Sequence, residues 1–179
     1  MSTNKKIAKY LIFIFCFNIF SSIAQTNEDV PLNNISINEI PKPISSIIFE
    51  DFSGNKINLI DYSGKLVIIN FWATWCAPCK KEMPSLDKLY QSEDFKNLQI
   101  FAVNMEQPNK LKTKKFFNNL NIKKLSIFFD KDLNFVKKFR LRGVPTTILI
   151  NKKGEEFARI TGEVDFLDKN FLKWLLKYD

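Results

Sequence analysis

The sequence contains no histidine, and it has only three cysteines and five glycines in 179 residues. A structural zinc ion usually takes four cysteine or histidine ligands, and the absence of histidine and of a second cysteine pair disfavours such a site. The formal net charge is +8, yet the sequence has no glycine-rich loop, arginine cluster or aromatic stacking motif typical of nucleic-acid binders. We therefore expect no metal, no cofactor and no nucleic-acid partner.

The first 24 residues have the pattern of an export signal. Basic residues (Lys5, Lys6 and Lys9) precede an apolar run at 11–20, and small residues follow up to Ala24. A membrane span needs about 20 apolar residues, and this run is shorter. We therefore expect cleavage after Ala24, with retention as an N-terminal membrane tether as the alternative. Either outcome places the protein in the periplasm or at the outer face of the inner membrane.

The rest of the chain is long enough for one domain. Residues 25–43 contain three prolines and several asparagines, which predicts an irregular linker. Residues 44–179 can bury a core without disulfide staples, and we expect a monomer.

The segment Cys76-Ala77-Pro78-Cys79 is the most informative motif of the sequence. It follows the apolar run 66–72, which is typical of a strand buried on both faces, and it precedes a stretch with helical spacing up to about residue 93. The two thiols therefore lie one helical turn apart at a strand–helix junction. A structural staple would close so short a loop that its entropic gain is small. A reversible redox pair is the favoured interpretation.

The remaining periodicity predicts an α/β protein with a central mixed sheet flanked by helices. An added N-terminal β-hairpin is expected at 47–49 and 57–59, where Ser53-Gly54-Asn55 forms the turn. The order βαβ followed by ββα is that of a thioredoxin fold. Further strands are expected at 98–104, 126–129, 146–151 and 155–161, and further helices at 109–120, 133–139 and 166–178.

Four segments resemble the TlpA branch of the thioredoxin-like family. They are residues 71–79, 82–87, 102–104 and 143–147, and the resemblance covers about residues 44–178. It implies an exported thiol–disulfide reductase in which Glu82 is an acid–base group. It also implies a cis peptide bond between Val144 and Pro145 that faces the cysteines.

The motif also suggests which thiol attacks. At the helix start, Cys76 meets unpaired backbone N–H groups and the positive end of the helix dipole, both of which favour the thiolate. Cys79 lies one turn further in and is expected to resolve the mixed disulfide. Pro78 stiffens the segment between the two sulfurs, and it is also an ordinary helix-start proline.

Glu82 lies one further turn along the same helix face as Cys79. If the carboxyl group is partly buried, its pKa rises and it can exchange a proton with Cys79 near neutral pH. The alternative is a surface acid paired with a neighbouring lysine at 80, 81 or 88. Asn70 stands where cytosolic thioredoxins generally carry an acid, which leaves the proton transfer to Glu82 or water.

Four residues are candidates for substrate binding: Pro78, which lies between the two cysteines, and Trp75, Val144 and Pro145. Trp75 adjoins Cys76 and can form part of an apolar contact surface, or it can be packing at the rim of the core. Val144 and Pro145 precede an expected strand, and a cis proline there leaves backbone that can pair with an extended substrate. A plain strand-entry proline is the alternative.

These features predict a reductant of oxidised cysteine pairs in exported proteins, recharged by a membrane-bound thiol electron donor. The resemblance points to copper-site proteins of respiratory oxidases as substrates, with apocytochrome c as the alternative. A peroxidase is disfavoured because Thr74 lies two rather than three residues before Cys76. A Cu(I)-binding chaperone is disfavoured by the lack of histidine. The direction of electron flow depends on the reduction potential, which the sequence does not give.

Overall fold

The computed structural model describes residues 32–179. The predicted export signal, its cleavage site and the first part of the predicted linker lie outside these residues. Within 32–179, no helix has both the length and the apolar character needed to cross a membrane.

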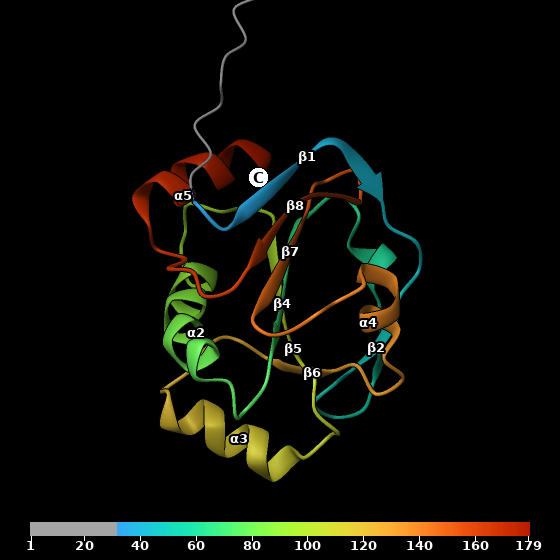
Figure 1. Cartoon of the computed structure of the whole chain (residues 1–179), viewed down its shortest axis with the longest axis vertical. Coiled ribbons are helices and arrows are strands. Elements are labelled where there is room, and N and C mark those ends of the chain that lie inside the picture. Colours follow the sequence, from blue (N-terminus) through green and yellow to red (C-terminus); the bar gives the residue numbers. More distant parts are fainter. Residues whose placement is uncertain (1–31) are drawn as a thin grey trace, which may run out of the picture.

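An eight-stranded mixed sheet forms the centre of the molecule (Figure 1). Its spatial order is β1-β8-β7-β4-β5-β6-β2-β3. The strands are β1 (Ile35–Pro43), β2 (Ile48–Asp51), β3 (Lys56–Asn58), β4 (Leu66–Trp72), β5 (Leu98–Asn104), β6 (Ile127–Phe129), β7 (Thr146–Ile150) and β8 (Glu155–Thr161).

Strand β4 lies in the middle of the sheet, and all seven of its residues are buried. It pairs in parallel with β5 and antiparallel with β7. Because side chains alternate along a strand, Leu66, Ile68 and Trp72 pack on one face, whereas Ile69 and Phe71 pack on the other. This alternation explains the continuous apolar run, since helices cover both faces.

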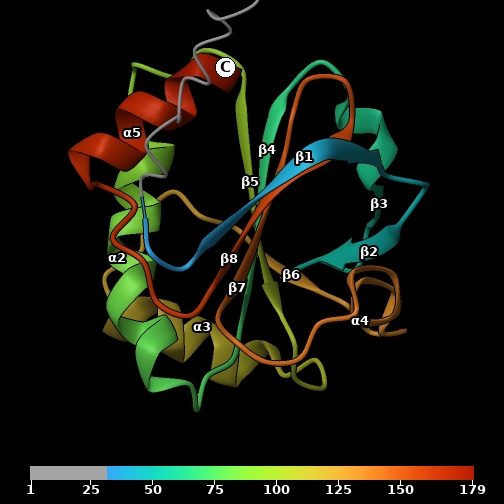
Figure 2. The ribbon, with the colours of Figure 1, turned by 45° about the horizontal axis from the view of Figure 1, so that its top comes forward.

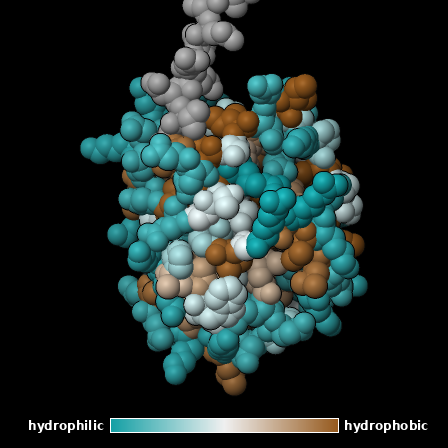
Figure 3. Space-filling model, viewed as in Figure 1, coloured by the Kyte–Doolittle hydropathy of each residue, from teal (hydrophilic) through white to brown (hydrophobic). Residues whose placement is uncertain are grey.

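The helices form one layer on each side of the sheet (Figures 1 and 2). Helices α2 (Ala77–Tyr90), α3 (Lys110–Asn119) and α5 (Lys169–Leu175) cover one face. Helix α4 (Asn134–Phe139) lies on the other face with the 3-10 turn η1 (Leu59–Tyr62), and a second 3-10 turn, η2 (Leu176–Tyr178), follows α5. The surface seen in Figure 3 is largely hydrophilic, with hydrophobic patches between the polar side chains.

The predicted thioredoxin fold is confirmed, including the added β2–β3 hairpin. The last helix begins at Lys169 rather than at residue 166. The reason is a cap: the Asp168 carboxylate accepts hydrogen bonds from the backbone N–H groups of Asn170 and Phe171.

The predicted irregular linker is wrong for residues 35–43, which form β1. Strand β1 pairs antiparallel with β8 at the edge of the sheet. An edge strand needs only half of its backbone groups for pairing, so Pro41 and Pro43 do not prevent it. The ordered domain therefore begins before residue 44.

Candidate active site

The cysteine pair lies at the N-terminus of α2, as the sequence predicts. Cys76 is the N-cap residue, and Pro78 occupies the first turn. Cys76 and Cys79 form a disulfide with a Cα–Cα distance of 5.3 Å. The sulfur of Cys76 also accepts a hydrogen bond from the backbone N–H of Cys79 at 3.2 Å. A thiolate at this position would meet the same donor and the helix dipole, both of which stabilise negative charge.

Both cysteines are largely buried, and they lie next to an exposed aromatic side chain. Cys79 is fully buried, whereas Cys76 keeps 3% of its surface exposed and directly follows Trp75, which is 70% exposed. The other tryptophan of the segment, Trp72, is buried and stacks on Phe116. The side chain that adjoins Cys76 is therefore an exposed aromatic surface.

Glu82 is buried on the inner face of α2. Its Oε1 accepts a hydrogen bond from Asn70 Nδ2 at 2.7 Å, and its Oε2 accepts one from the backbone N–H of Val164 at 3.2 Å. Burial raises the pKa of Glu82 to about 7, against the lowering effect of these two hydrogen bonds, and nearby Glu163 adds to the rise. The surface-acid alternative is wrong, because Glu82 is 1% exposed and Lys81 pairs with Glu163 instead.

Asn70 reaches Glu82 because both lie between β4 and α2. The Asn70 Nδ2 group is shared by Glu82 and the hydroxyl of Thr147 on β7. Its Oδ1 atom is buried and has no hydrogen-bond partner within residues 32–179. The amide therefore donates to an ionised carboxylate, and after a flip it would offer an acceptor to a protonated one.

The peptide bond between Val144 and Pro145 is cis, as the resemblance implies. Thr146 pairs with Phe71 of β4, which sets Pro145 at the end of the sheet where the chain turns towards Cys76. The N–H and C=O groups of Val144 make no hydrogen bond within the described part of the chain. This backbone is therefore available to an incoming extended segment.

Sequence reasoning did not identify Glu106, which holds the loop before the cysteines. Its carboxylate accepts hydrogen bonds from the backbone N–H and the hydroxyl of Thr74, from Asn104 and from Lys112 Nζ. Partial burial opposes ionisation, but these hydrogen bonds prevail and lower the pKa of Glu106 to about 2. One feature of the predicted topology could have indicated this contact. Strands β4 and β5 are parallel, so the residues that follow each of them lie close together at one edge of the sheet.

Three comparisons place the site among known proteins. Residues 40–155 match the model of the AhpC/TSA family. A thiol-disulfide oxidoreductase ResA from Halalkalibacterium halodurans is 39% identical over 117 residues, which are 65% of this chain and 65% of that protein. Its counterpart from Bacillus thuringiensis subsp. konkukian is 35% identical over 70% of this chain and 71% of its own. The structure of a thioredoxin-family thiol:disulfide interchange protein from Chlorobium tepidum TLS superposes with a TM-score of 0.65, at 20% identity, over 78% of this chain and 99% of that one.

We predict that the change Asn70→Ala raises the pKa of Glu82 above about 7, because it removes the hydrogen bond that favours the carboxylate. The measurement is an NMR titration of the glutamate carboxyl carbons in the oxidised protein. We expect Thr147→Val to leave the titration unchanged, because Thr147 contacts Asn70 and not Glu82. An unchanged titration in Asn70→Ala would contradict the assignment.

The same shift sets a pH dependence of stability. The folded-state pKa of about 7 lies above the ordinary value of 4.5. Protonated Glu82 therefore stabilises the fold fully below about pH 4.5, and this contribution is lost as the pH rises through about 7. In Asn70→Ala, the loss should extend to higher pH in urea unfolding curves.

We predict that Glu106→Gln lowers the free energy of unfolding by about 2 kcal/mol at neutral pH, because charge-assisted hydrogen bonds to the Thr74 loop are lost. The pKa of Glu106 is depressed, so its contribution is present above about pH 4.5 and disappears as the pH falls through about 2. Urea unfolding of the oxidised protein measures both effects. The control is Glu93→Gln at an exposed position, and equal unfolding midpoints for the two variants would refute the prediction.

Proposed function

Because this chain belongs to the AhpC/TSA family and is a thiol–disulfide oxidoreductase, we propose that its dithiol form reduces disulfides in exported proteins. The observation that carries the proposal is the spacing of three groups at the start of α2. A slightly exposed Cys76 is followed by a fully buried Cys79 and then by a buried carboxyl group with a pKa of about 7. Nucleophile, resolving thiol and proton acceptor thus succeed one another at three-residue steps along the start of one helix.

The reaction proceeds by two exchanges. The Cys76 thiolate attacks one sulfur of the substrate disulfide, which forms a mixed disulfide and releases one substrate thiolate. The Cys79 thiolate then attacks the Cys76 sulfur, which closes the Cys76–Cys79 disulfide and releases the second substrate sulfur. Two electrons and two protons pass from the protein to the substrate.

Glu82 supports the second exchange. Cys79 must lose its proton inside the core, where an isolated thiolate is costly. A carboxyl group with a pKa of about 7 is partly ionised at neutral pH, so it can accept that proton and return it in the reverse reaction. Asn70 is a positioning residue, because it acts through its hydrogen bond to Glu82.

Export and the identity of the partners belong to the same proposal. The N-terminal signal supports a periplasmic or outer-face location. A TlpA-like role would direct the protein to copper-site proteins of respiratory oxidases, and the alternative substrate is apocytochrome c. Both offer a cysteine pair, and a membrane-bound thiol donor would restore the dithiol.

Peroxide reduction of the peroxiredoxin type has less support. That chemistry requires a threonine three residues before the cysteine, whereas Thr74 lies two before Cys76. The Thr74 hydroxyl is moreover engaged by the Glu106 carboxylate at 3.0 Å. The threonine in this protein therefore fixes a loop.

We predict a reduction potential near that of thioredoxin, roughly −270 mV, as a reductant requires. Equilibration of the Cys76–Cys79 pair with dithiothreitol or glutathione buffers, followed by alkylation and mass spectrometry, measures it. A potential near roughly −120 mV would make the protein an oxidant and overturn the proposed direction of electron flow.

We predict that the Cys79→Ser form accumulates a mixed disulfide through Cys76, because the resolving thiol is absent. The substrates are two disulfide-closed peptides, one with the C-x-x-C-H segment of an apocytochrome c and one with the cysteine pair of a copper site. Intact-mass spectrometry detects the adduct.

The matched control for trapping is Cys76→Ser, which removes the proposed attacking thiol and keeps the fully buried Cys79. It should form no adduct with either peptide. Equal trapping by the two forms, or none by Cys79→Ser, would refute Cys76 as the attacking thiol. A preference of Cys79→Ser for one peptide would identify the substrate class.

A further inference from the structure

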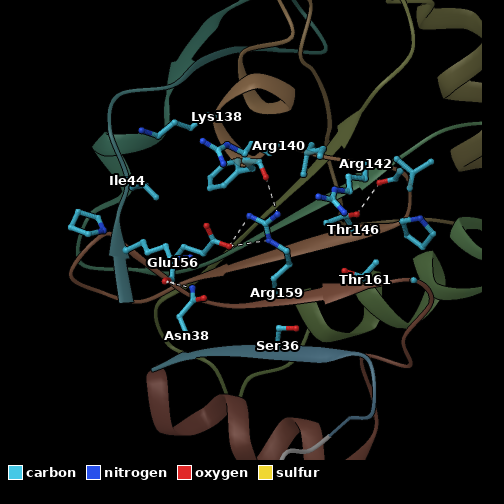
Figure 4. Close-up of a pocket in the computed structure, with 18 residues that line it drawn as sticks. Ser36, Asn38, Ile44, Lys138, Arg140, Arg142, Thr146, Glu156, Arg159 and Thr161 are labelled. Atoms are coloured by element: carbon cyan, nitrogen blue, oxygen red, sulfur yellow. Dashed lines mark hydrogen bonds and ion pairs between the residues drawn. The ribbon is translucent and has the colours of Figure 1, made fainter. Parts of the chain in front are cut away.

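A pocket of about 850 Å³ opens beside the cis proline and the paired strands β1 and β8 (Figure 4). Its walls come from β1, from the segment between α4 and β7, and from β8. Val144, Pro145 and Thr146 form one end of it. No step of the thiol–disulfide exchange uses the remainder.

Two irregularities in strand pairing create this hollow. Ile37 of β1 lies opposite Ala158 of β8, and Lys42 lies opposite Glu156. Five residues of advance along β1 therefore correspond to two along β8. Residues 38–41 have no Cα partner in the register with β8. A bulge also occurs in β8, opposite Leu149 and Ile150 of β7, and it brings Glu156 and Arg159 onto one face although they are three residues apart.

All three arginines of the sequence, Arg140, Arg142 and Arg159, line this pocket. The chain has 27 basic residues, so the other 24 are lysines. The sequence contains no run of arginines, but the fold brings all three to one pocket. Arginine is the residue suited to bidentate recognition of carboxylates, since its planar guanidinium presents paired donors.

The cations of the pocket differ in what they contact. The Arg159 guanidinium is held by Glu156 Oε1 at 2.8 Å and by the carbonyl oxygen of Phe139, also at 2.8 Å. Arg140 and Arg142, together with Lys42 and Lys138, make no ion pair within residues 32–179. The pocket thus holds four uncompensated positive charges, and Glu156, the one acid that lines it, is already paired.

The backbone at Arg140 supports a role for this side chain. Its φ of 50° ends α4 in the left-handed region. Glycine or asparagine adopts this conformation at lower cost than arginine does. Arg140 is exposed, so packing in the core does not account for an arginine here.

We propose that this pocket binds carboxylate side chains of an acidic segment in the protein whose disulfide is reduced. The proposal rests on the proposed function, because the segment is the continuation of the reactive one. A substrate paired with the free backbone of Val144 would extend directly past Arg142 and Arg140. Charge complementarity then selects among partners that offer equally reactive disulfides.

The test uses two disulfide-closed peptides that differ only in a flank of four aspartates or four asparagines. We expect the reduced protein to have a kcat/KM about tenfold higher for the aspartate peptide at low ionic strength, as for a few exposed ion pairs. Added salt should remove the difference. The double variant Arg140→Gln/Arg142→Gln should lose the preference and keep the wild-type rate on the asparagine peptide.

The matched control is Lys114→Gln/Lys115→Gln on α3, which removes two exposed charges outside the pocket and should keep the preference. A preference that survives in the arginine variant, or that is lost equally in the lysine variant, would overturn the proposal.

A second measurement separates this proposal from the proposed function. A fluorescent aspartate peptide without cysteine should bind the oxidised protein about tenfold more tightly than it binds the arginine variant. If neither disulfide peptide is reduced but this difference holds, the reductase function fails and the pocket stands. If both disulfide peptides are reduced at equal rates, and the cysteine-free peptide binds the wild-type protein and the arginine variant equally, the pocket proposal fails and the function stands.

Discussion

The burial of the Glu82 carboxyl group is the constraint on which the active site depends. A buried carboxylate is costly unless donors surround it, and the fold supplies two: the amide of Asn70 on β4 and the backbone N–H of Val164 after β8. These bonds join α2 to the sheet and to the segment that leads into α5. They fix the rotation of α2, and with it the inward position of Cys79 one turn earlier.

The two carboxyl groups near the cysteine pair have opposite electrostatic environments. Glu82 has neutral donors and deep burial, so its pKa is raised to about 7, whereas Glu106 has Lys112 and three further donors, so its pKa is lowered to about 2. A group that titrates near neutral pH can transfer protons, and a permanently charged one can hold a loop. In the proposed mechanism, proton transfer and the positioning of the loop therefore fall to two different carboxyl groups.

Local patterns made much of this site predictable. The apolar run of β4 and the helical spacing after Cys76 placed both thiols, and the three-residue step from Cys79 to Glu82 placed the acid on the same helix face. The sequence did not predict whether Glu82 is buried, because its burial depends on contacts with Asn70 and Val164, which are distant in the sequence. Strand β1 was hidden by its prolines, which an edge strand tolerates. The hydrogen bonds between Glu106 and the Thr74 loop arise from the parallel pairing of β4 and β5. The proximity of the three arginines depends on the tertiary fold, including the bulge in β8. Neither can be read from a short stretch of sequence.

Selectivity in such a protein has to arise away from the sulfurs. Thiol–disulfide exchange depends on thiolate character and access, and these do not distinguish one substrate disulfide from another of equal exposure. The segment from Arg140 to Pro145 links substrate selection to the reactive site. It begins in the basic pocket and ends at the cis peptide bond beside β4. Arg159 ties its start to β8 through the carbonyl of Phe139, and the Thr146 hydroxyl ties its end to the carbonyl of Gly143. A partner held by this segment would therefore be positioned by the rigid sheet that also positions Cys76.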